Sequence, residues 1–150
     1  MSANDTPHDI RIARDEDEVR RCWPAFRELR PHLQSEEEFL ARWRAQAGEG
    51  YQVAYVAEGD HVPAAAGYRL MSTMAWGRIL YLDDLVAMEA SQGTGLGTAL
   101  LKFLQGEARR LGCDALHLDT GYQRHLAHRA YLRNGFRMDC MHLAWKVEHD

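Results

Sequence analysis

The amino-acid sequence predicts a mixed α/β (α+β) fold, with helices covering both faces of a central mixed, mostly antiparallel sheet. Strand-like segments follow one another over 52–58, 63–75 and 78–88, and the links between them are short and turn-forming. Short links favour antiparallel neighbours. A strand–helix–strand crossover is then expected near the end of the chain, and it makes the predicted sheet a mixed one.

The N-terminal residues predict a tail and a first strand. Residues 1–7 are polar and are expected to form a flexible tail, so we expect a single folded domain over 8–150. Ile10 and Ile12 alternate with polar neighbours, which predicts a short strand around 8–13.

Helical segments are expected before the central strands. The first follows Asp15, carries apolar residues at helical spacing and ends at Pro31. Pro24 lies inside it and should kink the helix or restart it as a second short helix. The next helix begins at a capping box formed by Ser35 and Glu38.

The second half of the chain predicts alternating helices and strands. One apolar stripe runs along a helix over about 95–111. A short buried strand is expected over 115–119, a helix over about 123–133 and a last strand over 136–147.

Composition excludes several classes of protein. The net charge is −4 and no basic cluster occurs, which argues against nucleic-acid binding as the main activity. No apolar run approaches the roughly 20 residues that span a bilayer, and the N-terminus lacks an apolar signal core. The cysteines (Cys22, Cys113 and Cys140) are scattered and predict reduced thiols. We therefore expect a cytoplasmic protein that does not associate with membranes.

The most informative stretch is residues 92–97, Gln-Gly-Thr-Gly-Leu-Gly. It follows the apolar segment 81–88 and precedes the helix expected from about 95, an arrangement typical of phosphate binding. The spacing does not match a P-loop, and a dinucleotide fingerprint would need glycine where Thr98 stands. A dinucleotide-binding enzyme is therefore not expected.

The stretch fits the pattern Q/R-x-x-G-x-G and resembles the pyrophosphate-binding turn of the GNAT superfamily of N-acetyltransferases. The predicted order of elements is also similar, so the resemblance covers almost the whole chain. It implies the GNAT fold, with a sheet of six to seven strands and four helices, and acetyl-coenzyme A as co-substrate. The residues expected to bind that co-substrate at the turn are Gln92, Gly93, Thr94, Gly95, Leu96, Gly97 and Thr98.

The resemblance also implies roles for two further segments. In the family, the strand before the turn bulges and exposes backbone amides, which here are those of Leu85, Val86 and Ala87. A tyrosine about four residues before Gly-Phe protonates the leaving thiolate, and Tyr131 has this position; otherwise it is a packing residue.

The general base stays open between carboxylates and a histidine. Asp83 and Asp84 are adjacent in an apolar strand, and alternation predicts that they face opposite sides, so that at most one faces the acceptor. Asp83 is favoured for accepting the proton of the amine, and both could instead be structural. His117 and Asp119, expected on one face of the next strand, are the reserve candidates.

No metal site is expected. His125 and His128 have i, i+3 spacing on the last predicted helix, but no third ligand stands at a recognisable distance in the sequence.

These observations predict an enzyme that transfers an acetyl group from acetyl-coenzyme A to a primary amine by direct attack. The alternative is a non-catalytic acyl-coenzyme A sensor or interaction module of the same fold. The sequence leaves open the acceptor, which is a small molecule or a protein amine, and whether the chain forms a homodimer.

Overall fold

The computed structural model describes residues 7–149, and these divide after Leu118 into two compact units. The first unit is built on a five-stranded sheet with the order β1-β2-β3-β4-β5. Its strands are β1 (Ile10–Ile12), β2 (Tyr51–Glu58), β3 (His61–Thr73), β4 (Gly77–Ala87) and β5 (Ala115–Leu118). The strands β1 to β4 are antiparallel neighbours, and β5 pairs with β4 in parallel. The expected mixed, mostly antiparallel sheet is confirmed.

The first unit also contains the helices α1 (Glu16–Arg21), α2 (Trp23–Leu29), α3 (Glu36–Ala47) and α4 (Leu96–Arg110). Asp15 and Ser35 cap α1 and α3, each accepting a hydrogen bond from the third residue after it. Pro24 stands in the first turn of α2 and separates it from α1, as expected for a proline that restarts a helix.

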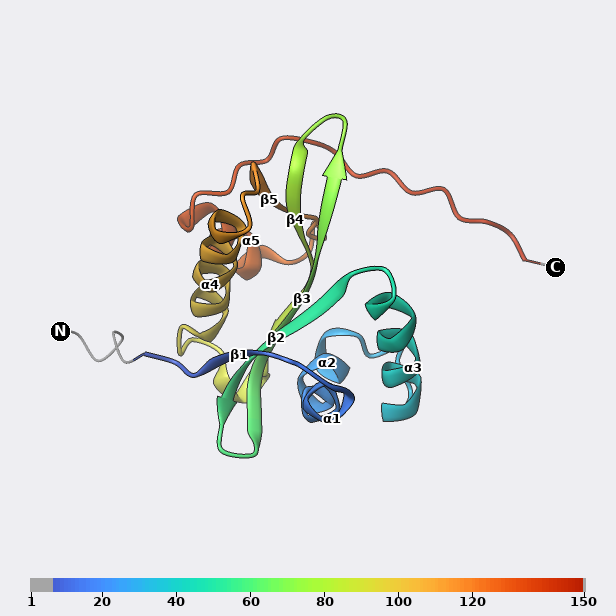
Figure 1. The fold of residues 1–150 in the computed structure, drawn as a ribbon, viewed down its shortest axis with the longest axis vertical. Coiled ribbons are helices and arrows are strands. Elements are labelled where there is room, and N and C mark those ends of the chain that lie inside the picture. Colours follow the sequence, from blue (N-terminus) through green and yellow to red (C-terminus); the bar gives the residue numbers. More distant parts are fainter. Residues whose placement is uncertain (1–6, 150) are drawn as a thin grey trace. The chain divides into compact units, whose positions relative to one another are not determined.

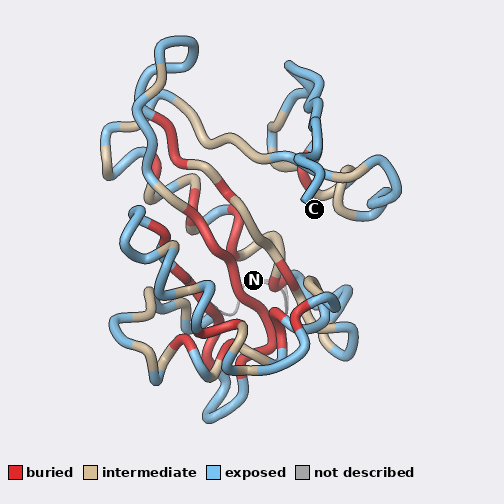
Figure 2. Tube along the Cα trace, turned by 90° about the vertical axis from the view of Figure 1, so that its right-hand side faces the viewer, coloured by how far each residue is buried: buried red, intermediate tan, exposed pale blue. Residues whose placement is uncertain are grey.

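Helices cover both faces of this sheet. Figure 1 shows the group α1 to α3 on one side of the strands and α4 on the other. Strand alternation explains the division, since Val53 and Tyr55 of β2 belong to the core formed with α1 to α3, and neighbours such as Ala54 point the other way. The buried residues follow the central strands and the inward faces of the helices (Figure 2).

A β-bulge interrupts the pairing of β3 with β4. Gly67 pairs with Asp84, but Tyr68 pairs with Leu82, so Asp83 is the extra residue on β4. The bulge overturns the expectation that Asp83 and Asp84 face opposite sides of the sheet, because strict alternation fails where one residue is inserted.

The second unit contains α5 (His125–Arg133) and an extended segment after it. The predicted strand over 136–147 is wrong, since these residues form no strand. An alternating pattern gives strand propensity, but a strand needs a neighbour for its backbone hydrogen bonds, and the described part of this unit has none. The apolar side chains of this segment are exposed, and the last four stand at every second position: Met138, Met141, Leu143, Trp145 and Val147.

Over the described residues the fold thus has five strands instead of six to seven, and five α-helices instead of four. The extra helix comes from the restart at Pro24. None of the helices in residues 7–149 has the length and apolar character needed to cross a bilayer.

Candidate functional site

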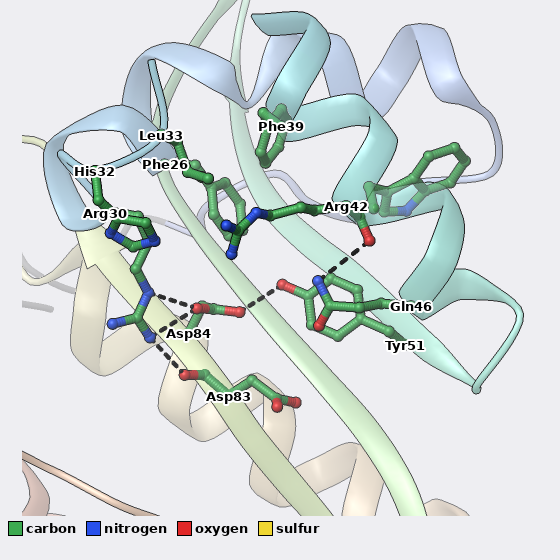
Figure 3. A pocket seen from close by; sticks show the side chains of 11 residues that line it. Phe26, Arg30, His32, Leu33, Phe39, Arg42, Gln46, Tyr51, Asp83 and Asp84 are labelled. Carbon is green, nitrogen blue, oxygen red and sulfur yellow. Dashed lines mark hydrogen bonds and ion pairs between the residues drawn. The ribbon is translucent and has the colours of Figure 1, made fainter. Parts of the chain in front are cut away.

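A pocket of about 340 Å³ lies in the first unit between α2, α3 and the bulged part of β4 (Figure 3). Both Asp83 and Asp84 line it, as a consequence of the bulge. The other lining residues are aromatic, apolar or basic: Phe26, Arg30, His32, Leu33, Phe39, Arg42, Trp43, Gln46 and Tyr51. The pocket therefore combines a hydrophobic wall with several charged groups.

Asp84 is fully engaged by protein donors. Its Oδ1 accepts hydrogen bonds from Nε of Arg30 at 3.0 Å and from Nη2 of Arg30 at 2.8 Å. Its Oδ2 accepts one from the hydroxyl of Tyr51 at 2.6 Å. Burial and the negative charge of Asp84 hold the pKa of Tyr51 well above its ordinary value, so this hydroxyl remains a donor. Asp84 is thus a structural anchor that ties β4 to α2 and β2.

Gly67 makes room for this anchor. A Cβ on Gly67 would lie 1.7 Å from the hydroxyl oxygen of Tyr51, a distance that no real contact reaches. The ring of Tyr51 therefore crosses β3 at the one residue without a side chain, directly opposite Asp84.

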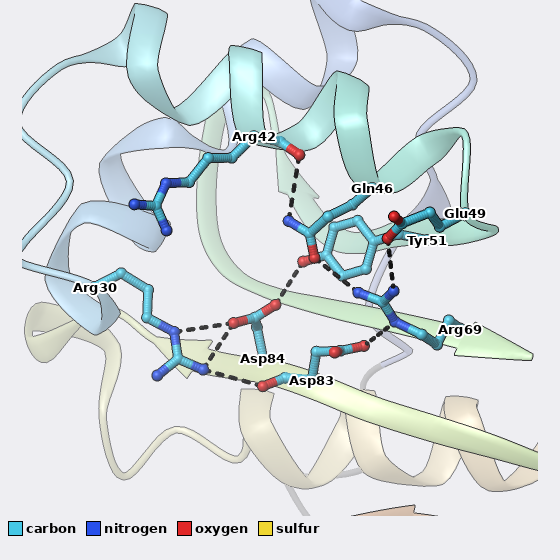
Figure 4. A network of polar contacts seen from close by, with 8 residues as sticks. All are labelled: Arg30, Arg42, Gln46, Glu49, Tyr51, Arg69, Asp83 and Asp84. Carbon is cyan, nitrogen blue, oxygen red and sulfur yellow. Dashed lines mark hydrogen bonds and ion pairs between the residues drawn. The ribbon is translucent and has the colours of Figure 1, made fainter. Parts of the chain in front are cut away.

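Asp83 is engaged on one side only. Its Oδ2 accepts a hydrogen bond from Nε of Arg69 at 3.0 Å, and Arg69 also donates to Oε1 of Gln46 at 2.7 Å. Its backbone carbonyl accepts from Arg30 at 3.0 Å. Within residues 7–149 its Oδ1 makes no hydrogen bond, and Figure 4 shows this oxygen free.

Burial raises the pKa of the Asp83 carboxyl above its ordinary value, and the hydrogen bond from Arg69 opposes this rise. A carboxylate with a free oxygen and a raised pKa is suited to accept a proton from a group bound in the pocket.

The backbone of β4 beyond the bulge has one open edge. Pairing with β5 ends at Leu82, so no strand of the described chain pairs with the other edge of residues 83–87. The N–H of Met88 donates a hydrogen bond to the carbonyl of Pro63, which shows which residues of β4 point their N–H groups towards β3. In an antiparallel pair alternate residues bond the partner, so the N–H groups of Leu85 and Ala87 point to the open edge and that of Val86 points to β3.

The glycine-rich turn leads directly into α4. Gly93 and Gly95 have φ of 82° and 85°, which favours glycine, and Gly95 is the N-cap of α4. Within residues 7–149 no side chain caps this helix, so the first N–H groups, those of Leu96, Gly97 and Thr98, have no capping partner there. The hydroxyl of Thr94 is held by the carbonyl of Ser91 and fixes the turn from within.

Gly97 has no structural need to be glycine. Its φ is not positive, and a Cβ would meet no atom within 4 Å. An open helix start that lacks a side chain at this position is suited to a phosphate group, which could approach the backbone closely. The residues therefore fit the diphosphate of coenzyme A.

In the second unit, Tyr131 lies near the end of α5 and is buried. Its ring packs edge-on against Phe136, with ring centroids 5.8 Å apart. Burial raises the pKa of its hydroxyl, and the charge of Arg124 partly offsets that rise. A tyrosine of this kind is protonated at neutral pH and can act as a proton donor.

The reserve candidates for the base have other surroundings. His117 stacks against Trp76 with ring centroids 4.4 Å apart and is not part of the pocket lining. Asp119 lies just after β5, which ends at Leu118, and pairs with Nδ1 of His142 at 3.2 Å. Asp119 is thus not on the strand, contrary to expectation.

His125 and His128 pack edge-to-face, and Nε2 of His128 lies 2.7 Å from the carbonyl oxygen of Gly121. Among the described residues, no group of three or more His, Cys, Asp or Glu side chains is arranged to hold a metal ion.

Sequence reasoning missed the residues that organise the pocket: Arg30, Arg42, Tyr51, Gly67 and Arg69. Gly67 carried a readable signal, because an isolated glycine in a strand often marks a bulge or a close backbone approach. The arginines carried none, since surface arginines look the same in sequence.

A profile of the Acetyltransferase (GNAT) family matches residues 16–136. An uncharacterized N-acetyltransferase of Bacillus subtilis, YhdJ, is 30% identical over 125 residues, which cover 82% of this chain and 87% of that protein. The aminoalkylphosphonate N-acetyltransferase of Salmonella typhimurium is 36% identical over 56 residues, but the match spans only 37% of this chain and 36% of that protein.

Solved structures show the same fold. A protein of Bacillus halodurans described as a transcriptional regulator is 17% identical and superposes with a TM-score of 0.81 over 94% of this chain and 100% of that chain. AAC(6')-Iy, in complex with a bisubstrate analog of coenzyme A, is 10% identical, with a TM-score of 0.78 over 96% of this chain and 100% of that chain. The sequence match is extensive and the fold agrees, so the chain belongs to the GNAT family of acetyltransferases.

Proposed function

We propose that the protein transfers the acetyl group of acetyl-coenzyme A to a primary amine by direct attack of the amine on the thioester. One observation carries this proposal. A single stretch of β4 offers the free carboxylate oxygen of Asp83 and, two and four residues later, the outward-pointing N–H groups of Leu85 and Ala87. A proton acceptor and donors for a developing oxyanion are the two groups that acyl transfer to an amine requires.

Binding of the co-substrate is assigned to the turn and the start of α4. The N–H groups of Leu96, Gly97 and Thr98 would hold the diphosphate, and the positive end of the helix dipole would add to this attraction. Gln92, Gly93, Thr94 and Gly95 would shape the approach to these groups.

The chemistry is divided among three groups of the protein. Asp83 accepts the proton that the ammonium must lose before its nitrogen attacks the acetyl carbon. The nitrogen releases a second proton as the amide forms, and this proton replaces the one that Tyr131 gives to the sulfur. The N–H groups of Leu85 and Ala87 polarise the carbonyl, while Val86 packs in the core between them. Tyr131 donates a proton to the sulfur as the carbon–sulfur bond breaks. Acetyl-coenzyme A supplies the activated thioester.

The alternative is a non-catalytic module that binds acyl-coenzyme A. The free oxygen and raised pKa of Asp83 favour catalysis, because a sensor has no use for a base in the acceptor pocket. The test is release of free thiol from acetyl-coenzyme A across a panel of amines, with the acetylated amine identified by mass spectrometry. Thiol release that depends on an amine supports the enzyme; tight binding of acetyl-coenzyme A without transfer supports the sensor.

Domain organisation and location complete the proposal. Residues 8–150 would act as one functional domain, since the family profile runs across the boundary at Leu118. The three cysteines are free, which suits a reducing compartment, and we propose the cytoplasm.

We also infer a homodimer. The extended segment after α5 exposes alternating apolar side chains, including Leu143 and Trp145, and such a strip is suited to pairing with a second copy. Analytical ultracentrifugation of the full chain should show a dimer that Leu143→Asp weakens; a monomer at all accessible concentrations contradicts this inference.

A further inference from the structure

The acceptor pocket contains an arginine whose charge is not neutralised by the pocket itself. We propose that the pocket selects a small primary amine carrying an anionic group, a carboxylate or a phosphonate, on a short chain. The amine would bind at Asp83 and the anion at Arg42. This substrate class rests on the proposed acetyl transfer and narrows its acceptor.

The other charges of the pocket are paired. Arg30 and Asp84 neutralise each other through two short hydrogen bonds. Asp83 is balanced by Arg69, which approaches it from β3, yet it keeps one oxygen free. Neither pair leaves a cation available for a ligand.

Arg42 differs from these residues. Its guanidinium makes no hydrogen bond within residues 7–149, and its ion pair with Glu38, one turn earlier on α3, is long at 3.7 Å. Both side chains of that pair are more than a third exposed, so the pair contributes little. Apart from the backbone hydrogen bonds of the helix itself, the backbone carbonyl of Arg42 accepts a hydrogen bond from the side-chain amide of Gln46 at 3.4 Å.

The guanidinium of Arg42 projects from α3 into the pocket (Figure 3). Its planar set of donors matches a carboxylate or phosphonate, which can accept two parallel hydrogen bonds. The aromatic side chains of Phe26 on α2 and of Phe39 and Trp43 on α3 also line the pocket and offer apolar surface to the methylene groups of a ligand.

Size and charge together restrict the acceptor. A volume of about 340 Å³ is at the lower end of the range of small-molecule sites, roughly 300–1,000 Å³. A diamine would bring its second cation towards Arg42 and Arg30, an arrangement that like-charge repulsion disfavours. A zwitterionic amine instead finds an opposite charge at each end.

The experiment compares acceptors with the same amine and different tails: γ-aminobutyrate and aminopropylphosphonate, butylamine, and putrescine. We expect kcat/KM to be roughly 10-fold or more higher for the anionic tails than for butylamine, as for a charge-assisted hydrogen bond. Putrescine should be the poorest acceptor. Equal values for butylamine and both anionic amines overturn the proposal.

Variants locate the effect. Arg42→Gln should reduce the ratio of kcat/KM between aminopropylphosphonate and butylamine to near one, and Arg42→Lys should keep part of it. Arg44→Gln is the matched control, because it removes the same charge from the same helix, but Arg44 pairs with Glu16 and does not line the pocket. A preference that survives Arg42→Gln, or that Arg44→Gln removes equally, refutes the assignment.

The proposed function can fail separately from this inference. If neither these amines nor the wider panel of the proposed function is acetylated, acetyl transfer is refuted, and calorimetry then tests the pocket directly. Aminopropylphosphonate should bind the wild-type protein more tightly than butylamine does, and Arg42→Gln should abolish the difference. The absence of that difference overturns the charge assignment as well.

Discussion

Gly67 on β3 and Asp84 on β4 are register partners beside the bulge, and the missing side chain of Gly67 gives the Tyr51 hydroxyl its place against the Asp84 carboxylate. The bulge itself turns Asp83 into the pocket. One glycine and one inserted residue therefore set the positions of both carboxylates.

Gly67→Ala should destabilise the protein by about 1–3 kcal/mol, the usual cost of forcing extra atoms into a packed site. The added methyl group would displace Tyr51 and break its bond to Asp84. Gly106→Ala is the control, because a Cβ on Gly106 in α4 meets nothing within 4 Å and should stabilise by up to about 1 kcal/mol through helix propensity. Urea denaturation measures both, and a Gly67→Ala protein as stable as the wild type would contradict this view of the site.

The pH dependence of the rate should identify the base. Asp83 must be deprotonated to accept a proton, so the rate should fall at acidic pH around the raised pKa of this carboxyl. Asp83→Asn should flatten this acidic limb, and activity should return at high pH, where free amine is abundant. An Asp83→Asn enzyme with the wild-type profile would move the role to another group.

The same raised pKa has a consequence for stability. A carboxyl whose pKa is higher in the folded than in the unfolded state binds its proton more tightly when folded. The contribution of the Asp83 carboxyl to the free energy of unfolding is therefore complete at pH values below its pKa in the unfolded state. This contribution is lost as the pH rises through its pKa in the folded state. Asp83→Asn should remove this pH-dependent contribution to stability. Chemical denaturation of the wild type and the variant at a series of pH values would reveal the difference.

Asp84→Asn provides the contrast. Arg30 and Tyr51 bind both oxygens of Asp84, so Asp84→Asn should destabilise the protein. The expected cost is about 1–2 kcal/mol, because Arg30 is partly exposed and solvent screens part of the lost ion pair. The shape of the rate–pH profile should not change. A shifted acidic limb in Asp84→Asn, measured under the same conditions, would show that Asp84 takes part in proton transfer.

Much of the fold could be predicted because it depends on local patterns. The central strands β2 to β4 lie within two residues of their predicted bounds, since buried runs between turn residues are visible in sequence. The prediction of a strand over 136–147 was wrong, because a strand depends on a partner strand and an alternating pattern alone does not provide one.

The site was less predictable than the fold. Asp83 was predicted as a candidate base and lines the pocket, but the bulge that turns it there was not predicted, because a register shift of one residue leaves no compositional trace apart from Gly67. The partners Arg30 and Tyr51 are 54 and 33 residues away from Asp84 in sequence. Only the tertiary structure brings such residues together.

Tyr131→Phe should lower kcat by roughly 10²–10⁴-fold while the affinity for acetyl-coenzyme A changes little, the range typical for loss of a general acid. The raised pKa of this tyrosine keeps its proton in place at neutral pH. Tyr122→Phe, an exposed tyrosine of the same unit, serves as the control. Stopped-flow or steady-state thiol release measures the effect, and near wild-type turnover would make Tyr131 a packing residue.

Two glycines of α4 allow a matched test of co-substrate binding. Gly97 and Gly106 both face open space, so alanine should be tolerated by the fold at either position. Only Gly97 lies in the first turn, where a phosphate would approach the free N–H groups, so only Gly97→Ala should obstruct it.

At about 100 times its Kd, acetyl-coenzyme A should stabilise the wild type and Gly106→Ala by roughly 2.7 kcal/mol, and Gly97→Ala by clearly less. Thermal unfolding with and without ligand measures these shifts. Equal stabilisation of both variants by acetyl-coenzyme A would place its binding site elsewhere. Stronger stabilisation of the wild type by NAD than by coenzyme A would contradict the assignment of the ligand.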